Sequence, residues 1–212
     1  MISPNESDRN LEAANVVDGL FAIARGLNRL AEGCVCTGTG TSGGLGFYGA
    51  QTVTAVAKNC VAYDLQYGFQ GGNGTTNANI YPTYFVNCLA HTCSVGFRSQ
   101  NSNNNNSMLL MACGYYNCTT PLSAGLDTSM QFLGSGAQGA PLSCSVDPCT
   151  SASGGNFNLN NTANGGALLR AAGWNLVYGG NSTGYLDIGA VQSQAPAAGA
   201  LIVNRGMYGG LT

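Results

Sequence analysis

The chain has 212 residues, a length that suits one domain with a substantial core. Only 8% of the residues are charged and the formal net charge is −2, so the chain offers no basic patch for a nucleic acid. No apolar run reaches the length of a membrane span, about 18 residues. The start, MISPNESDRN, lacks the basic and apolar regions of a secretory signal, so we expect synthesis in the cytoplasm without export.

Residues 8–32 show the pattern of an amphipathic helix, so we expect 1–33 to form a helical N-terminal segment. Apolar residues recur there at intervals of four and three, as in a heptad seam. They are Val16, Leu20, Ile23, Leu27 and Leu30. Two interpretations stay open: the helix caps the first coil of a repeat, or it is an oligomerisation or attachment element, most simply of a homotrimer.

Cysteines five residues apart occur three times after this segment and indicate a repeat. Aligning KNCVAYDLQYGF, VNCLAHTCSVGF, MACGYYNCTTPL and LSCSVDPCTSAS predicts two internal ladders of small apolar residues. The first ladder is Cys60, Cys88, Cys113 and Cys144, and the second is Leu65, Cys93, Cys118 and Cys149. The GF pairs at 46–47, 68–69 and 96–97 follow the same repeat. Coils of a β-solenoid stack like residues on like in this way.

Disulfides and metal ligation are the competing interpretations of the cysteines. Nine is an odd number, so a monomer leaves at least one unpaired. Leucine at position 65 replaces a packing residue and not a metal ligand, and His91 is the only histidine. We therefore expect ladders, with some disulfide as the alternative and with no metal or cofactor.

Chemistry is hard to place on this repeat. Tyr63, His91 and Tyr116 occupy one slot of successive coils and predict a surface column, which serves packing or, alternatively, stacks a glycan. The acids of the coils, Asp64, Asp127, Asp147 and Asp187, fall at positions that are not equivalent, so no carboxylate pair is expected. Asp147 precedes a proline and has the character of a turn residue. The sequence predicts no catalytic residue and no enzyme.

Residues 142–192 carry a more specific signal, in VDPCTSASGGNFNLNNTANGGALLRAAG and TGYLDIGAVQ. These segments resemble the closing coils of right-handed parallel β-helix proteins of the pectate-lyase-like superfamily. The matching residues are Asp147, Pro148, Gly155, Phe157, Leu159, Gly173, Asp187, Ile188, Gly189 and Ala190. The resemblance implies an all-β fold over 34–192, a right-handed single-stranded parallel β-helix of about five to six coils. That family includes lyases, hydrolases, adhesins and viral spikes, so it does not fix a function.

The tail, residues 193–212, lies beyond the repeat. A Pro/Ala/Gly run and one apolar stretch, ALIVN, predict a linker and a strand. The tail could fold back as a cap or add a strand to a neighbouring subunit.

A short, unexported rod with a helical attachment segment resembles bacteriophage virion appendages. We therefore expect a structural virion protein (a head fibre, capsid decoration or tailspike), non-catalytic and self-assembling in the bacterial cytoplasm, where cysteines stay reduced. Its expected partners are itself, as a homotrimer, other virion proteins and a host surface glycan. The alternatives are a polysaccharide-binding or polysaccharide-degrading β-helix and a surface adhesin or filament subunit.

Overall fold

The computed structural model describes residues 11–12, 15–17, 21–23, 29–40, 43–49, 54–71, 82–99, 108–123, 130–133, 140–170, 172–174 and 187–192. Strands dominate these ranges. Helix is confined in them to the four-residue α1 (Gly166–Leu169) and the 3-10 turn η2 (Ala152–Gly154). The predicted all-β class is therefore confirmed. The predicted tail at 193–212 lies outside the described residues.

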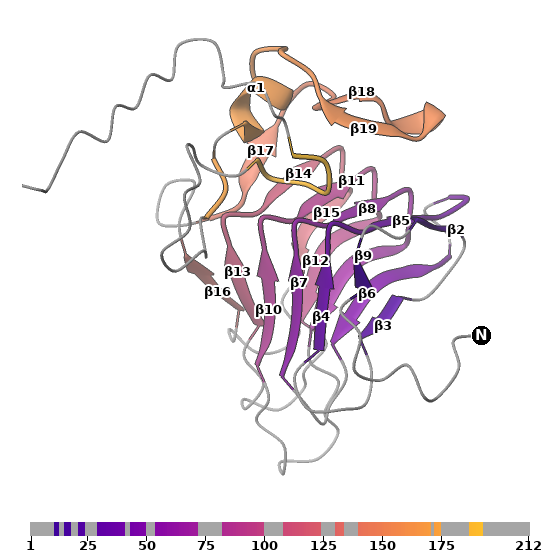
Figure 1. The fold of residues 1–212 in the computed structure, drawn as a ribbon, viewed down its shortest axis with the longest axis vertical. Coiled ribbons are helices and arrows are strands. Elements are labelled where there is room, and N and C mark those ends of the chain that lie inside the picture. The colour runs from indigo at the N-terminus through magenta and orange to yellow at the C-terminus, as the bar shows by residue number, and fades with distance from the viewer. Residues whose placement is uncertain are drawn as a thin grey trace, which may run out of the picture.

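Three parallel sheets make up most of the described chain (Figure 1). Sheet A contains β1 (Leu11–Glu12), β4 (Arg29–Glu32), β7 (Ala55–Lys58), β10 (Thr83–Val86), β13 (Met108–Met111) and β16 (Met130–Leu133). Sheet B contains β2 (Asn15–Val17), β5 (Val35–Thr37), β8 (Val61–Tyr63), β11 (Leu89–His91), β14 (Gly114–Tyr116) and β17 (Leu142–Cys144). Sheet C contains β3 (Phe21–Ile23), β6 (Leu45–Gly49), β9 (Tyr67–Gly71), β12 (Val95–Ser99) and β15 (Thr120–Ser123).

Successive strands enter sheets A, B and C in strict rotation. Each set of three strands forms one level of a stack, and each strand pairs in parallel with its counterparts in the levels before and after it. Five complete levels are present in the described residues, and β16 and β17 begin a sixth. Equivalent residues of neighbouring levels therefore lie one strand spacing apart, about 4.8 Å.

Two sharp corners in each of three levels, β7–β9, β10–β12 and β13–β15, explain the five-residue interval of the cysteines. Six corner residues have a left-handed backbone, with φ between 48° and 55°. Those between sheets A and B are Asn59, Asn87 and Ala112, and those between sheets B and C are Asp64, Thr92 and Asn117. The residue after each of these belongs to a ladder. Because the sheet B strand between the corners has three residues, one ladder residue follows the other after five positions.

The ladders hold in register for most of the predicted members. At the first corner Cys60, Cys88 and Cys113 lie at successive levels, and Cys34 precedes them. At the second corner the order is Leu65, Cys93 and Cys118. All of these pack in the main core, to which strands of all three sheets contribute, with Cys118 partly buried.

A phenylalanine column fills the sheet C side of this core. Phe47 and Phe97 each stack on Phe69 with ring centroids 5.0 Å apart, and Phe85 from sheet A meets Phe69 edge-on. The glycine before each stacked phenylalanine lets the levels approach closely. A Cβ at Gly46, for example, would lie 2.4 Å from the carbonyl oxygen of Gly68. The repeated GF pair is therefore a packing requirement of the stack.

The predicted N-terminal helix over 8–32 is wrong in the described residues. Those residues form β1 to β4 and add a level to the stack, with Asn15–Val17 paired to Val35–Thr37 and Phe21 in register with Phe47. Backbone hydrogen bonding is consistent with the difference, because the edge of a parallel sheet presents a row of unpaired N–H and C=O groups that a further strand can pair with. Of the predicted seam, Val16 lies in β2, Ile23 in β3 and Leu30 in β4, while Leu20 and Leu27 fall outside the described residues.

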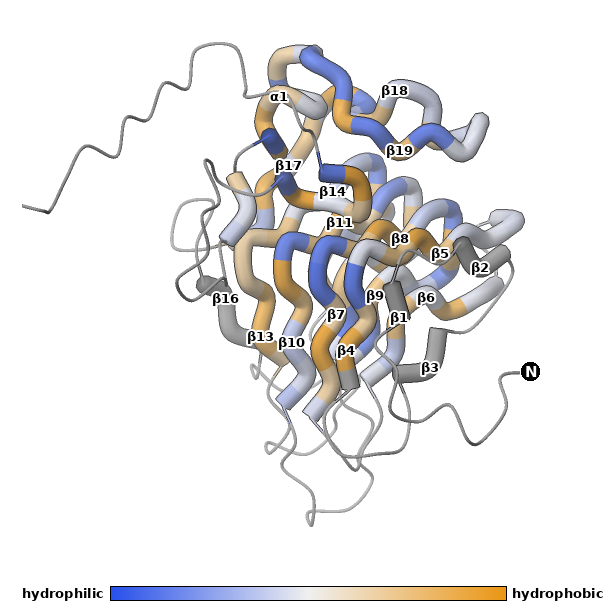
Figure 2. Tube along the Cα trace, viewed as in Figure 1, coloured by the Kyte–Doolittle hydropathy of each residue, from blue (hydrophilic) through white to orange (hydrophobic). Residues whose placement is uncertain are grey.

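The stack ends sooner than predicted, at β17. Residues 145–170, here called the return segment, leave the sheets and fold over the outer face of sheet B (Figure 1). It carries an antiparallel hairpin of β18 (Cys149–Ser151) and β19 (Asn156–Leu159), followed by α1. Figure 2 shows polar and apolar residues alternating along β19, as suits a strand with one buried face.

Cys144 and Cys149 are therefore not ladder members, which corrects the sequence alignment. Cys144 is in register with Tyr116, and Cys149 opens the hairpin. Cys144 misses the first ladder because Leu142 pairs with Gly114, so that residue 141 corresponds to Cys113. Pro148 applies to Cys149 only: it has no N–H to donate, which disfavours a further parallel strand after the corner. Both cysteines lie in a second core between sheet B and the return segment. That core contains Val35, Val61, Leu89, Cys144, Cys149, Ala152, Phe157, Leu159, Leu169 and Ile188.

We expect Asn87→Ala to lower the free energy of unfolding by about 3 kcal/mol, against about 1 kcal/mol for Asn117→Ala. Both residues are left-handed, so both substitutions incur the backbone penalty. Only Asn87 also binds the Asn59 side chain at 3.1 Å and both backbone groups of Trp174. Urea unfolding of the two variants measures the difference. Equal losses would show that the buried amide network adds nothing to the corner.

Candidate functional site

Tyr63, His91 and Tyr116 do form one column, on the outer face of sheet B. The ring of His91 lies 5.2 Å from that of Tyr63 and 4.9 Å from that of Tyr116. The column is not open, however. The return segment covers it: Phe157 packs edge-on against Tyr63, and His91 keeps only 2% of its surface exposed. Within the predicted surface glycan stack, His91 is therefore closed off, while Tyr63 and Tyr116 stay half-buried, and glycan binding by this column stays a prediction.

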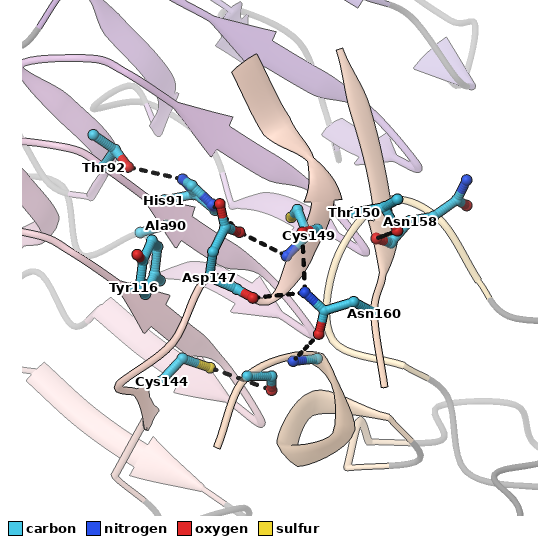
Figure 3. Close-up of polar contacts among 12 residues, drawn as sticks. Ala90, His91, Thr92, Tyr116, Cys144, Asp147, Cys149, Thr150, Asn158 and Asn160 are labelled. Atoms are coloured by element: carbon cyan, nitrogen blue, oxygen red, sulfur yellow. Dashed lines mark hydrogen bonds and ion pairs between the residues drawn. The ribbon is translucent and has the colours of Figure 1, made fainter. Parts of the chain in front are cut away.

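His91 joins the sheet to the return segment through one ring nitrogen, and the other contacts the neighbouring corner residue. Its Nε2 lies 3.0 Å from Oδ1 of Asp147, and its Nδ1 lies 2.9 Å from the hydroxyl of Thr92 (Figure 3). An ionised carboxylate can only accept, so Nε2 carries a proton that it donates to Asp147. In the neutral ring Nδ1 then accepts from the Thr92 hydroxyl.

Asp147 is held in place from its own segment. The same Oδ1 accepts the backbone N–H of Cys149 at 2.8 Å, which is the turn expected of this residue from the sequence. The side chain of Asn160 binds the carbonyls of Asp147 and Cys149 and accepts the N–H groups of Thr162 and Gly166 (Figure 3). All four hydrogen-bonding positions of this amide are used, so the loop before β18 is fixed.

Burial controls the protonation of the groups around Asp147. Burial lowers the pKa of His91, and the hydrogen bond to Asp147 opposes it only in part, so the ring is neutral at pH 7. Burial also raises the pKa values of Cys144 and Cys149 to about 12, and the negative charge of Asp147 adds to the rise in both. At neutral pH these two groups are thiols.

His91, Asp147 and Cys149 form a cluster that sequence reasoning missed. One ligand atom from each lies within 4.8 Å of the others, a grouping compatible with a metal ion. Asp147 follows His91 by 56 positions and Cys149 follows Asp147 by two, so the three residues form no recognisable spacing motif. The sequence does contain a single histidine, His91, and the triplet Asp-Pro-Cys at 147–149. Neither of them indicates that the chain returns over sheet B.

The ladder thiols make a different arrangement in the main core. Each points to two carbonyls, one two residues earlier and one in the preceding level, as Cys88 does to Val86 at 3.3 Å and Ala57 at 3.4 Å. Cys60, Cys88 and Cys113 also hydrogen-bond to one another, and burial raises the pKa of Cys88 well above its usual value. All nine cysteines, each of them among the described residues, lack disulfides. Burial also acts to raise the pKa of Cys60, but its hydrogen bonds with Cys34 and Cys88 hold that pKa well below its usual value. The ladder is therefore a hydrogen-bonded row of free cysteines.

The described acids other than Asp147 also serve the fold. Glu32 pairs with Lys58 of the next level at 2.6 Å, Asp64 makes a left-handed corner, and the backbone of Asp187 is bound by the Gln192 side chain. Asp127 lies outside the described residues. Within the described part of the chain, no helix has the length and apolar character that a membrane crossing requires.

Comparison with protein-family models, curated proteins and solved structures gives no match to this chain. The interpretation of the site therefore rests on its own geometry.

We expect one thiol per native chain, Cys118, to react rapidly with an aromatic disulfide reagent, and all nine to react after unfolding without reductant. Cys118 is the only partly exposed cysteine, and its hydrogen bond with Cys93 holds its pKa below the usual value. Absorbance of the released thiolate counts the reacting groups. Cys118→Ala serves as control and should abolish the rapid phase; fewer than nine thiols after unfolding of the natural chain would establish a disulfide.

We expect Asp147→Ala to destabilise the fold by about 3 kcal/mol and Asp147→Asn by about 1 kcal/mol. Alanine leaves the buried N–H of His91 and the amide of Cys149 without their acceptor, while asparagine keeps an acceptor and removes only the charge. Urea unfolding gives the global effect, and hydrogen exchange at the amides of Cys149 and Asn160 reports opening of the return segment. Equal effects of the two substitutions would contradict the role given to this oxygen.

Proposed function

We propose that the chain is a right-handed parallel β-helix and a structural, non-catalytic protein of a bacteriophage particle, as a head fibre, capsid decoration or tailspike-like appendage. The rotation of successive strands through three parallel sheets supports the β-helix. Parallel strands joined by crossover connections are right-handed in about 98% of cases, which supports the handedness. The resemblance of 142–192 to the pectate-lyase-like superfamily agrees with it.

The observation that supports the structural role is that polar side chains of the described chain make contacts within the fold. The corner amides bind other corners and the C-terminal residues, as Asn87 does, and the His91–Asp147 pair fastens the return segment to sheet B. In the aromatic column that could have stacked a sugar, His91 is covered, and Tyr63 and Tyr116 are half-buried. This distribution favours a rigid part over a glycan-binding or glycan-degrading surface.

The ends of the stack support self-association. Among the described residues, β1, β2 and β3 each have a strand on one side only, and so do β15, β16 and β17 at the other end. Exposed strand edges must be covered by the same chain or by another, since bare edges pair indiscriminately. The described N-terminal residues form strands and not the predicted helix. We therefore propose that these strand edges, and not a helix, form the contacts within a homotrimer and with other virion proteins.

The experiment is the solution mass of the full chain, measured by light scattering over a wide concentration range. The proposal expects a discrete species at three times the chain mass of 21.6 kDa that does not grow with concentration. A monomer at all concentrations would contradict self-association. Open-ended growth would favour the filament alternative.

Two further measurements separate the particle role from the remaining alternatives. Labelled protein should bind virions that lack it in a saturable manner, as seen by co-sedimentation. Release of reducing ends from capsular polysaccharide by the purified chain would overturn the non-catalytic part of the proposal and favour a depolymerase.

A further inference from the structure

We propose that His91, Asp147 and Cys149 form a zinc-binding site that fastens the return segment to sheet B. The inference goes beyond the structural role above and does not depend on the particle to which the chain belongs. It starts from the geometry: a histidine at the end of β11 faces a carboxylate and a thiol from the loop that enters β18 (Figure 3).

The donor set selects the class of ion. Nitrogen, oxygen and sulfur donors together suit Zn²⁺, whereas Mg²⁺ and Ca²⁺ take oxygen ligands almost exclusively. Ligand atoms bound to one zinc lie about 3–4 Å apart, given bond lengths of about 2.0–2.3 Å. The three donor atoms already lie within 4.8 Å of one another, and His91 Nε2 is 3.0 Å from Asp147 Oδ1, so small side-chain adjustments suffice.

The surroundings of the ligands match those of known metal sites. A metal-bound histidine usually donates its other ring N–H to a fixed acceptor, and here Nδ1 lies 2.9 Å from the Thr92 hydroxyl. On binding, the ring proton moves from Nε2 to Nδ1 and is donated to Thr92, Nε2 binds the ion, and the Cys149 thiol releases its proton to solvent. Asn160 holds the backbone on both sides of Pro148 and so orients the two ligands from the return segment.

A fourth position remains for water or for a neighbouring thiol. The side chain of Asp147 is 45% exposed, which gives an ion a way in, while that of His91 is 3% exposed. Cys144 packs in the same second core as Cys149, so its thiol is the further ligand that we consider for this position. Three protein ligands and one open position are typical of zinc sites that retain a water.

Linkage gives the site a measurable consequence. The ligands come from positions 91, 147 and 149, which only the folded chain brings together. An ion that binds the folded state and not the unfolded one raises the melting temperature in proportion to the logarithm of its free concentration. Zinc should therefore stabilise the chain progressively, and removal of the ligands should abolish the dependence.

The test uses the full chain with Co²⁺ as a spectroscopic probe and Zn²⁺ as competitor. We expect one equivalent of Co²⁺ to produce a thiolate-to-cobalt charge-transfer band that stoichiometric Zn²⁺ displaces. Cys149→Ala should remove the band and lower the affinity at least tenfold, and His91→Phe should lower it by a similar factor while preserving the ring packing. Cys118→Ala removes a thiol outside the cluster and should leave the titration unchanged.

A measurement on the natural chain keeps the test decisive if a variant fails to fold. X-ray absorption at the zinc edge should show one sulfur at about 2.3 Å together with nitrogen or oxygen ligands at about 2.0 Å; two sulfurs would place Cys144 in the fourth position. A shell without sulfur, no binding at micromolar metal, or a cobalt band that survives Cys149→Ala would overturn the proposal. In those cases the His91–Asp147 contact is a hydrogen bond alone.

Discussion

The fold depends on a backbone conformation that most residues avoid. The three levels from β7 to β15 each turn sharply twice within a few residues, and a left-handed residue at each of these corners makes the turn. Asparagine and aspartate tolerate this conformation, which accounts for Asn59, Asp64, Asn87 and Asn117. Ala112 and Thr92 are the exceptions; Thr92 is the more strained of the two because it is β-branched, and its hydroxyl is the group that contacts His91. The strained corner thus coincides with the contact between sheet and return segment.

The corners also explain why cysteine, and not a larger apolar residue, lines the stack. The residue after each left-handed position faces inward where the chain turns, so the space is small and carbonyl groups lie close by. A thiol fits that space and donates weakly to the carbonyls, as Cys60 does to Lys58 at 3.2 Å. Valine would fill the volume without a donor, and serine would add a strongly polar group to an apolar core. Position 65 accommodates leucine because Gly38 and Gly44 of the preceding level leave room for it.

Periodicity in the sequence predicted the repeat, the ladder positions through Cys118 and the column of Tyr63, His91 and Tyr116. It could do so because residues that stack in register at successive levels recur at regular intervals along the chain. It could not predict where the repeat stops. Residues 142–149 match the cysteine spacing, but their parallel pairing ends at Cys144 and its register places residue 141, not Cys144, opposite Cys113. It also misassigned residues 8–32, since apolar residues at 16, 20, 23, 27 and 30 satisfy a helical period while short strands use some of the same positions. The missed cluster at His91 follows from the same limit: a chain reversal over one sheet face leaves no periodic trace.

The three connections within a level differ in their freedom. Two residues always separate sheet A strands from sheet B strands between β4 and β14, as at 33–34 and 59–60. The connection back to sheet A varies, from Gly49 to Ala55 at one level and from Gly71 to Thr83 at the next. One residue added at a corner would shift the alternation and turn the inward side chains of a strand outward. Residues added between a sheet C strand and the next sheet A strand leave every face of the sheets unchanged. One side of the stack can therefore carry inserted sequence, and an epitope or a second domain could be displayed there at each level.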